Sequence, residues 1–287
     1  MNQAINSIPP LPELLVEPLV RATLAEDLGR AGDITTDAII PVDTHSELFL
    51  VARKPGVLAG LDLARLAFQL IDTRVEFEVL LKDGARLQKG SRIARMSGPA
   101  RAILSAERTA LNFLCHLSGI ATVTAEIADS IAEYNCHVTC TRKTTPMLRS
   151  LEKYAVRVGG GRNHRFGLDD AVLIKDNHIA VAGSLTTAVE RARAAVGHLV
   201  SIEVEVDTLV QLDEALAIGV DVVLLDNMSL DELAEAVRRI DGRAISEASG
   251  GVTPETAIEI AKQGVNQIAI GWITHSAPIL DIGLDVI

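Results

Sequence analysis

Short apolar runs alternate with amphipathic segments over the second half of this chain, and this alternation restricts its fold more than any other feature. The apolar runs lie at residues 171–175, 199–206, 220–226, 243–247 and 266–271. Between them, a helical periodicity predicts helices over residues 185–196, 209–217, 230–240 and 255–263. Strands that alternate with helices in this way form parallel βα units. The pattern that begins near residue 137 therefore predicts a βα barrel.

Polar residues stand where these apolar runs end. The ends carry Lys175, Glu205, Asp226, Glu247 with Ser249, and Gly271. In a βα barrel, side chains at the carboxyl ends of the strands line the active site. Charged residues placed there repeatedly are hard to explain by packing, so the set predicts a site at this end of the barrel.

The first third of the chain has a different pattern, typical of a small α+β unit. Periodicity predicts a helix over residues 11–28 and another over 61–71. Residues 46–53, 75–82 and the alternating pieces within 85–96 read as strands. A long helix over residues 101–126, broken near Gly119, is expected to connect the two halves.

Composition favours a cytoplasmic protein and disfavours several classes. The net charge of −11 is unlike the basic field of a nucleic-acid binder. An odd count of three cysteines, Cys115, Cys136 and Cys140, indicates buried thiols in a reducing compartment rather than a disulfide framework or a zinc site. The first ten residues show no signal peptide, and the longest uncharged stretch, residues 109–125, is short and polar for a membrane span. We therefore expect neither a nucleic acid nor a membrane as partner.

A basic segment from Arg142 to Arg165 stands out in this acidic chain. It holds seven lysines or arginines and His164, against one acid, Glu152. Arginine forks bind carboxylates and phosphates in a bidentate manner, which suggests an anionic ligand. Arg149 and Arg157 fit a solvated helix face equally well. The remaining candidates flank turn residues and are Arg142, Lys143, His164 and Arg165.

The turn Ser249-Gly250-Gly251-Val252-Thr253-Pro254 joins a predicted strand to a predicted helix. Backbone N–H groups of such a turn, together with the helix dipole, bind phosphate. In βα barrels the phosphate site often follows the last strands. Gly271 ends the next strand, close to His275, and is a candidate for the same site.

Three acids and one lysine complete the candidate site. Strand alternation places Glu203 and Glu205 on one face, and these two with Asp226 could carry Mg²⁺ with substrate phosphates, stabilise a developing positive charge, or pair with nearby cations. Lys175 could form a Schiff base or act as a fixed cation for a substrate anion. The residues themselves leave these alternatives open.

Several segments, in the same order along nearly the whole chain, resemble the quinolinate phosphoribosyltransferase family. In the barrel half they are Thr141-Arg-Lys-Thr-Thr-Pro146, Leu151-Glu-Lys-Tyr-Ala-Val156, Gly159-Gly-Gly-Arg-Asn-His-Arg165, Leu173-Ile-Lys-Asp-Asn-His-Ile179, Ile202-Glu-Val-Glu-Val-Asp207, Leu224-Leu-Asp-Asn-Met228, Glu247-Ala-Ser-Gly-Gly251 and Thr274-His-Ser-Ala-Pro278. Upstream they are Glu26-Asp-Leu-Gly29, Gly32-Asp-Ile-Thr35 and Glu107-Arg-Thr-Ala-Leu-Asn112. The chain departs from the family pattern at Cys140, where an aspartate is common, at Met147, where a glycine is common, and at Trp272 and Ile273, where smaller residues are usual.

The resemblance implies an α/β protein with an N-terminal open α/β sandwich over residues 1–115 and an incomplete TIM-like βα barrel over 116–275, with residues 276–287 packing back on the first domain. It implies a homodimer with shared active sites, Arg108 reaching across to the partner subunit. It also implies the transfer of phosphoribosyl from phosphoribosyl pyrophosphate to quinolinate with loss of CO₂, giving nicotinate mononucleotide for NAD biosynthesis, with Mg²⁺ accompanying the phosphoribosyl substrate.

The same resemblance implies roles for individual residues. Arg142, His164, Arg165 and Lys175 would hold the quinolinate carboxylates, with Thr141 beside them. Lys143 would contact phosphate or substrate, and Glu205 and Asp226 would serve the ribose and bind Mg²⁺; these three are the expected catalytic residues. The phosphate groups would be bound by Ser249, Gly250, Gly251, Gly271 and His275.

Three other functions compete with this interpretation. A related phosphoribosyltransferase for another base, such as nicotinate, would need fewer cations and would release no CO₂. A Schiff-base aldolase would use Lys175 and would be trapped by borohydride with a carbonyl substrate. A sensor would bind phosphoribosyl pyrophosphate without turnover.

Overall fold

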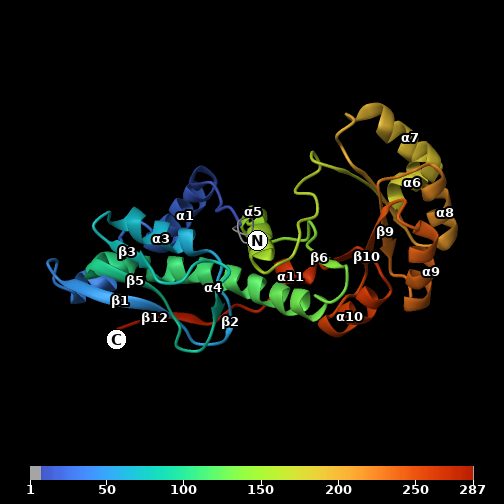
Figure 1. Cartoon of the computed structure of the whole chain (residues 1–287). Coiled ribbons are helices and arrows are strands. Elements are labelled where there is room, and N and C mark those ends of the chain that lie inside the picture. The colour runs from blue at the N-terminus through green and yellow to red at the C-terminus, as the bar shows by residue number, and fades with distance from the viewer. Residues whose placement is uncertain (1–7, 287) are drawn as a thin grey trace. The chain divides into compact units, whose positions relative to one another are not determined.

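The structure, a computed structural model, describes residues 8–286 and divides into two compact units (Figure 1). The first comprises the chain up to Val123, residues 157–159 and the segment from Ser276 onward, and the second comprises Thr124–Val156 and Gly160–His275. The division between Val123 and Thr124 falls within one continuous helix, several residues after the boundary expected at residue 115, because that helix supplies residues to both units.

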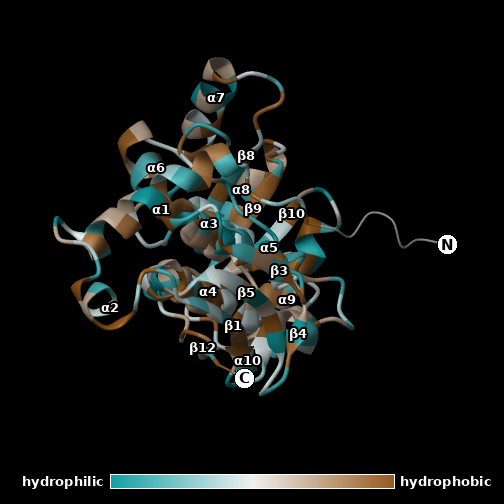
Figure 2. Ribbon diagram, turned by 90° about the vertical axis from the view of Figure 1, so that its left-hand side faces the viewer, coloured by the Kyte–Doolittle hydropathy of each residue, from teal (hydrophilic) through white to brown (hydrophobic). Residues whose placement is uncertain are grey.

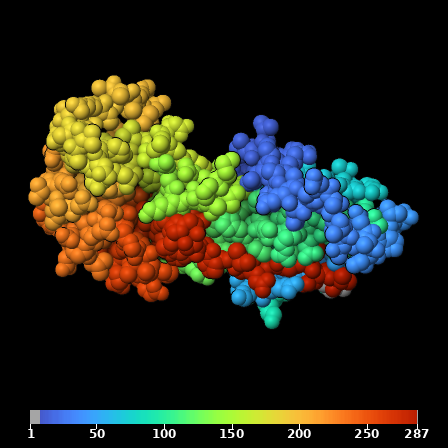
Figure 3. Space-filling model, turned by 180° about the vertical axis from the view of Figure 1, so that it is seen from behind, coloured from blue at the N-terminus to red at the C-terminus, as the bar shows by residue number. Residues whose placement is uncertain are grey.

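A four-stranded antiparallel sheet forms the centre of the first unit. Its strands, in spatial order, are β12 (Ile282–Asp285), β1 (His45–Ala52), β5 (Arg92–Pro99) and β3 (Glu76–Val79). A two-stranded ribbon pairs β2 (Gly56–Val57) with β4 (Arg86–Leu87), and the helices are α1 (Glu13–Leu28), α2 (Ile34–Ile39) and α3 (Leu61–Ile71). The pairing of β12 with β1 brings the C-terminal segment beside the N-terminal part of the unit, as the red and blue atoms of Figure 3 show.

Helix α4 (Ala100–Ser130) is unbroken, so the interruption expected near Gly119 was wrong. Gly119 is required for another reason. A Cβ at this position would lie 2.2 Å from the carbonyl oxygen of Pro278, so only glycine lets the C-terminal segment approach so closely. By length and composition α4 could cross a membrane, but 78% of its most apolar window is buried inside the protein, as in a core helix.

Six parallel strands form the sheet of the second unit. Their spatial order is β6 (His137–Thr139), β11 (Gln267–Ala269), β10 (Ile245–Ser249), β9 (Val222–Asp226), β8 (Ile202–Val206) and β7 (Val172–Ile174). A complete βα barrel has eight strands, and β6 and β7 are the two edges of this sheet. The predicted α/β class, with an N-terminal sheet domain and an incomplete barrel, is confirmed.

The helices of this unit follow the strands as the periodicity predicted. Four of them are α7 (Leu185–Ala195), α8 (Leu209–Ala217), α9 (Leu230–Ile240) and α10 (Pro254–Lys262). Three short or polar helices were not predicted: α5 (Arg149–Val158), α6 (Asp176–Ala182) and α11 (Trp272–His275).

Local signals explain where these helices begin and which face they bury. The side chains of Thr208, Ser229 and Thr253 each accept a hydrogen bond from a backbone N–H of the first helical turn. Helix α9 buries Leu233, Ala236 and Ile240 and leaves its charged face in solvent. Figure 2 shows the same alternation of hydrophilic and hydrophobic residues along α7.

Residues two apart on a strand share a face, so two layers of residues lie on the face of the strands that borders one cavity, and all of them except Thr139 and Glu203 line it. The upper layer, at or just beyond the carboxyl ends, consists of Thr141, Lys175, Glu205, Asp226, Ser249 and Gly271. The lower layer lies two residues earlier on each strand and consists of Thr139, Leu173, Glu203, Leu224, Glu247 and Ala269. Apart from Gly271, the upper layer consists of polar residues, whereas the lower layer has three apolar residues, one threonine and two glutamates.

Candidate active site

A cavity of about 970 Å³ opens at the carboxyl ends of the barrel strands. Its size is that of a small-molecule site. Every residue that lines it belongs to the barrel unit. Thirteen of the predicted site residues are among them: Thr141, Arg142, Lys143, His164, Arg165, Lys175, Glu205, Asp226, Ser249, Gly250, Gly251, Gly271 and His275. The fourteenth, Arg108, is exposed on α4 in the other unit.

Arg142 and Arg165 carry buried polar atoms that have no partner. Within the described part of the chain, the Nε atoms of both guanidinium groups are buried without a hydrogen bond. Burial and the neighbouring positive charge of Arg142 lower the pKa of Arg165. Unpaired buried donors and repelling cations are costly, so this part of the cavity favours an anion that accepts from both arginines.

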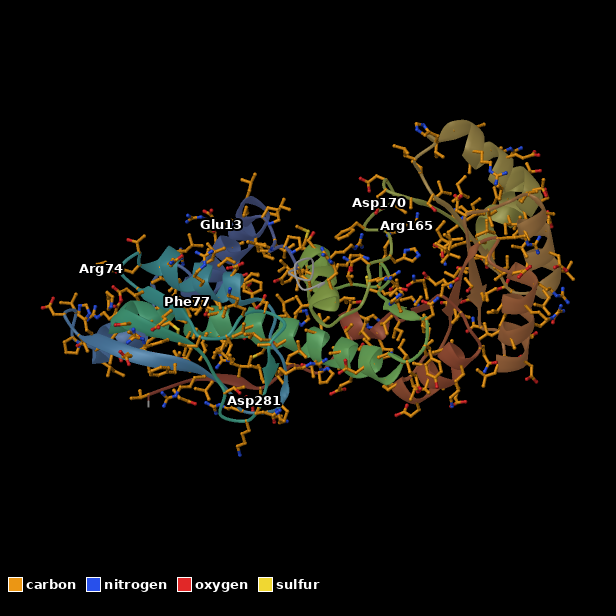
Figure 4. The ribbon with its side chains drawn as sticks, in the orientation of Figure 1. Glu13, Arg74, Phe77, Arg165, Asp170 and Asp281 are labelled. Atoms are coloured by element: carbon orange, nitrogen blue, oxygen red, sulfur yellow. The ribbon has the colours of Figure 1, made fainter. Side chains whose placement is uncertain are left out.

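The segment that carries Arg165 is held from several directions. Arg165 Nη1 donates to the carbonyl oxygen of Ala171 (2.9 Å), and the carboxylate of Asp170 accepts from two backbone N–H groups, of Phe166 and Gly167. Figure 4 labels Arg165 and Asp170 on this segment. From α5, the buried Lys153 donates to the carbonyl oxygen of His164 (2.9 Å) and to Cys140 Sγ (3.0 Å). The arginine is thus positioned before any ligand binds.

The predicted glycine-rich turn leads directly into α10, with Thr253 as N-cap and Pro254 at the first helical position. Gly250 has a φ of +109°, and a Cβ there would lie 2.1 Å from Asn227 Oδ1. Trp272, one of the departures from the family pattern, lies after the next strand, β11. Its indole Nε1 donates to the carbonyl oxygen of Val252 in the turn (3.0 Å) and so fixes the turn. The turn and the helix N-terminus together can accept a phosphate group.

Lys143 is positioned by its backbone. Its N–H donates to Thr141 Oγ1 (3.0 Å), and its carbonyl oxygen accepts from Thr274 Oγ1 (2.7 Å). A Cβ at Gly271 would lie 2.9 Å from Lys143 Cδ, so the glycine leaves room for the lysine stem. Lys143 is itself exposed at the cavity.

Two carboxylates of the upper layer face the same cavity. Glu205 accepts a short hydrogen bond from Lys175 Nζ, and Asp226 accepts from Asn227 Nδ2 (2.7 Å). Both acids are only partly exposed. Carboxylate oxygens that converge on a cavity are the ligands that Mg²⁺ prefers when it also binds substrate phosphates, so this donor set fits that ion.

Below them, in the lower layer, His164 lies between two buried acids. Its Nε2 is 2.8 Å from Glu203 Oε2 and 3.6 Å from Glu247 Oε1, and its Nδ1 accepts from the backbone N–H of Arg165 (2.8 Å). Both ring nitrogens are therefore engaged within the protein, whereas the sequence led us to expect that His164 would bind a substrate carboxylate.

The two acids shift the pKa values of this cluster. Burial lowers the pKa of His164, but the hydrogen bond with Glu203 and the charges of both acids outweigh burial and raise it. Burial and then the charge of Glu203 raise the pKa of Glu247 to about 8. Glu247 was expected among the polar strand ends and Glu203 on the same strand face as Glu205, but the sequence pattern carried no sign that both would be buried around one histidine.

The fold and the cavity place the chain among βα-barrel proteins with a basic, half-buried site for small anions. Sequence models of the N-terminal and C-terminal domains of quinolinate phosphoribosyl transferase match residues 33–118 and 120–285. The chain belongs to this family.

Similar proteins are found in several bacteria. The nicotinate-nucleotide pyrophosphorylase [carboxylating] of Mycobacterium leprae is 47% identical, covering 93% of this chain and 95% of its own length. A probable nicotinate-nucleotide pyrophosphorylase [carboxylating] of Bacillus subtilis is 45% identical, with 95% and 94% coverage. The crystal structure of NadC from Streptococcus pyogenes superimposes with a TM-score of 0.94 at 41% identity, covering 97% of this chain and 98% of that one.

The raised pKa of Glu247 predicts that stability falls as pH rises from about 4.5 to about 8. In this window the unfolded glutamate is ionised while the folded one keeps its proton, so unfolding releases a proton and is favoured by higher pH. Urea unfolding of the wild type and of Glu247→Gln at several pH values checks this. In the variant, the free energy of unfolding should depend less steeply on pH. The remaining dependence comes from His164, whose raised pKa also makes stability fall as pH rises. An identical pH dependence in both proteins would contradict the assignment.

Proposed function

We propose that this protein transfers a phosphoribosyl group from phosphoribosyl pyrophosphate to quinolinate and releases pyrophosphate and CO₂, with nicotinate mononucleotide as product. One observation carries the proposal: two arginines with unpartnered, buried Nε atoms share a cavity with a glycine-rich turn at a helix N-terminus. A base that bears two carboxylates and a sugar that bears phosphates together match this pair of anion sites. The similar proteins of Bacillus subtilis and Mycobacterium leprae are named for the same nicotinate nucleotide, pyrophosphate and carboxyl chemistry.

In this proposal the quinolinate carboxylates bind Arg142, Arg165 and Lys175. The first two offer the unpartnered guanidinium donors, and Lys175 stands at the end of β7 on the same cavity. His164 contributes its ring surface rather than a free nitrogen, since Nδ1 and Nε2 are engaged by Arg165 N–H and Glu203. Thr141 lies beside Arg142 at the end of the edge strand β6.

The phosphoribosyl substrate binds at the other side of the cavity. Its phosphate groups are held by the turn and by neighbouring residues, namely Ser249, Gly250, Gly251, Gly271, His275 and Lys143. Glu205 and Asp226 hold the Mg²⁺ that accompanies the pyrophosphate and face the ribose. When bound, that ion neutralises charge on the leaving pyrophosphate.

The reaction then follows from positioning and charge. The pyridine nitrogen attacks the anomeric carbon with its own lone pair, so no general base is needed. Positive charge that develops on the ribose is stabilised by the carboxylates of Glu205 and Asp226. Holding two polyanions in line supplies much of the remaining barrier reduction. Once the nitrogen is quaternary, it stabilises the electron pair left on the adjacent ring carbon, and the 2-carboxylate departs as CO₂.

We also propose that the protein is a cytoplasmic homodimer with shared sites. Arg108 is exposed on α4, in the unit that contributes no residue to the cavity lining. The free, buried thiols of Cys115, Cys136 and Cys140 fit a reducing compartment.

The reaction is tested by incubating the protein with quinolinate, phosphoribosyl pyrophosphate and Mg²⁺, with nicotinate as a control base. We expect equal yields of nicotinate mononucleotide and CO₂ from quinolinate and no product from nicotinate. Product from nicotinate alone would change the substrate and refute the proposal. Absence of turnover with both bases would instead favour the aldolase or sensor functions, which borohydride trapping at Lys175 and a binding assay would separate.

Arg165→Ala and Lys175→Ala should each reduce kcat/KM for quinolinate by about 30-fold or more, because removing one partner of a buried ionic contact costs roughly 2–5 kcal/mol. Arg162→Ala is a matched control, since Arg162 is exposed on the same segment as Arg165 and does not line the cavity. Steady-state kinetics with varied quinolinate make the comparison. Wild-type efficiency in either cavity variant would show that its assignment to the carboxylates is wrong.

Mixing two inactive variants tests the shared site. Arg108→Ala and Arg142→Ala subunits, dissociated and reassociated in equal amounts, should regain about a quarter of wild-type activity, since half of the dimers are mixed and each mixed dimer has one intact site. Each variant treated alone is the control. If no activity returns although mixed dimers form, Arg108 does not act in the partner's site.

A further inference from the structure

The proposed reaction leaves one chemical need unmet. When CO₂ departs, the electron pair of the broken carbon–carbon bond stays on the ring carbon, which must then accept a proton. A neutral acid on the wall of the cavity would supply this proton. The inference rests on the proposed function, since that reaction is what creates the need for a proton.

Glu247 is placed on that wall. It lies in the middle of β10, in the lower layer, directly below Ser249 of the proposed phosphate turn. It is 4% exposed, and its Oε1 has no hydrogen-bond partner in the described part of the chain. Its neighbours in the lining of the lower layer are the apolar Leu173, Leu224 and Ala269. Glu247 therefore lines the cavity beside three apolar residues, with one carboxyl oxygen that has no hydrogen-bond partner in the described part of the chain.

The hydrogen bonds of His164 argue that this cluster holds a proton rather than a metal ion. The ligand atoms of His164, Glu203 and Glu247 lie within 4.8 Å of one another, which is close enough for an ion. However, the Arg165 N–H donates to Nδ1, so the proton of the neutral ring is on Nε2 and is donated to Glu203. A metal on Nε2 would require the proton on Nδ1, where it would face the Arg165 N–H.

The same geometry indicates which acid carries the proton. Glu203, from β8, accepts the hydrogen bond of His164, whereas Glu247 Oε1 has no such donor in the described part of the chain. The other groups around Glu247 are His164, the Lys153 ammonium from α5 and the hydroxyl of Thr139 on β6. Its partners on the adjacent strands, Leu224 and Gln267, are uncharged. Burial and the charge of Glu203 outweigh the opposing effect of His164, Thr139 and Lys153, and the pKa of Glu247 rises to about 8.

We propose that Glu247 is the general acid that protonates the ring carbon from which CO₂ has left. The bond between the ring carbon and the carboxyl carbon breaks, and its electron pair stays on the ring. That pair then takes the proton of the Glu247 carboxyl group and forms the new C–H bond, leaving Glu247 as a carboxylate. The carboxylate, unfavourable beside Glu203, recovers a proton from solvent after the product leaves.

The other proton carriers of the cavity are less suited to this step. Lys143 and Lys175 are exposed at the upper layer, where their positive charge serves the substrate anions. Lys153 does not line the cavity, and its Nζ donates to Cys140 and His164.

Single-turnover kinetics of Glu247→Gln test the proposal, with enzyme in excess over quinolinate and with acid quenching. Glutamine keeps the shape of the side chain but has no acidic proton. We expect pyrophosphate to form at close to the wild-type rate, whereas nicotinate mononucleotide forms about 10²–10⁴-fold more slowly. The carboxylated mononucleotide should accumulate between the two steps. Mononucleotide formation at the wild-type rate, or equal slowing of both steps, would overturn the proposal.

The pH profile of the wild type gives a test that needs no variant. The rate of nicotinate mononucleotide formation should fall as pH rises through about 8, because Glu247 loses its proton. The variant Glu203→Gln changes the same cluster but keeps Glu247. It should move the fall in rate to lower pH, because it removes the charge next to Glu247. A profile that stays flat through this pH range would overturn the proposal. If the wild type does not convert quinolinate at all, the proposed function itself is refuted. This outcome is recognised separately, from the yields of mononucleotide and CO₂.

Discussion

The alternation of side chains along parallel strands is the constraint on which the site depends. Six strands run in the same direction, so their carboxyl ends meet at one edge, and every second residue points into the same space. This places a polar layer at the mouth of the cavity and, beneath it, a layer in which half of the residues are apolar. The helices and their caps keep the strands in this order, while the turns between them supply the ligand-binding groups.

Charge is distributed between the two layers in opposite ways. In the upper layer, the one cation, Lys175, pairs with Glu205, and solvent reaches both side chains. In the lower layer, two acids are buried with one histidine, and the cheapest arrangement is for one acid to remain neutral. One barrel therefore offers charged groups for binding and, two residues deeper, an uncharged acid.

Much of the fold could be predicted because local signals agree with the global structure. The limits of α3, α8 and α9 agree with their apolar periodicity, and the five later barrel strands were found as apolar runs. The first strand of the barrel, β6, was missed because three residues carry no alternating pattern. The break expected at Gly119 was wrong because a glycine inside a helix can be required by a neighbouring backbone, which sequence periodicity does not reveal.

The residues around the cavity could be predicted because charged residues at strand ends are rare without a function. What the sequence could not reveal is which polar atoms the protein itself uses. Both nitrogens of His164 are engaged by groups that lie one residue and thirty-nine residues away. Trp272 appeared only as a departure from the family pattern, yet its indole donates to the backbone of the glycine-rich turn. Such pairings depend on three-dimensional contacts between segments that sequence spacing does not bring together.

The pairing of β12 with β1 has a consequence for synthesis on the ribosome. The sheet of the first unit gains its outer strand from residues 282–285, which are translated after the whole barrel. The N-terminal segment emerges before the barrel but lacks this edge until residues 282–285 have been made, and by then all strands of the barrel have been made. Since domains generally fold as units during synthesis, the barrel can complete its sheet before the unit that precedes it in the chain.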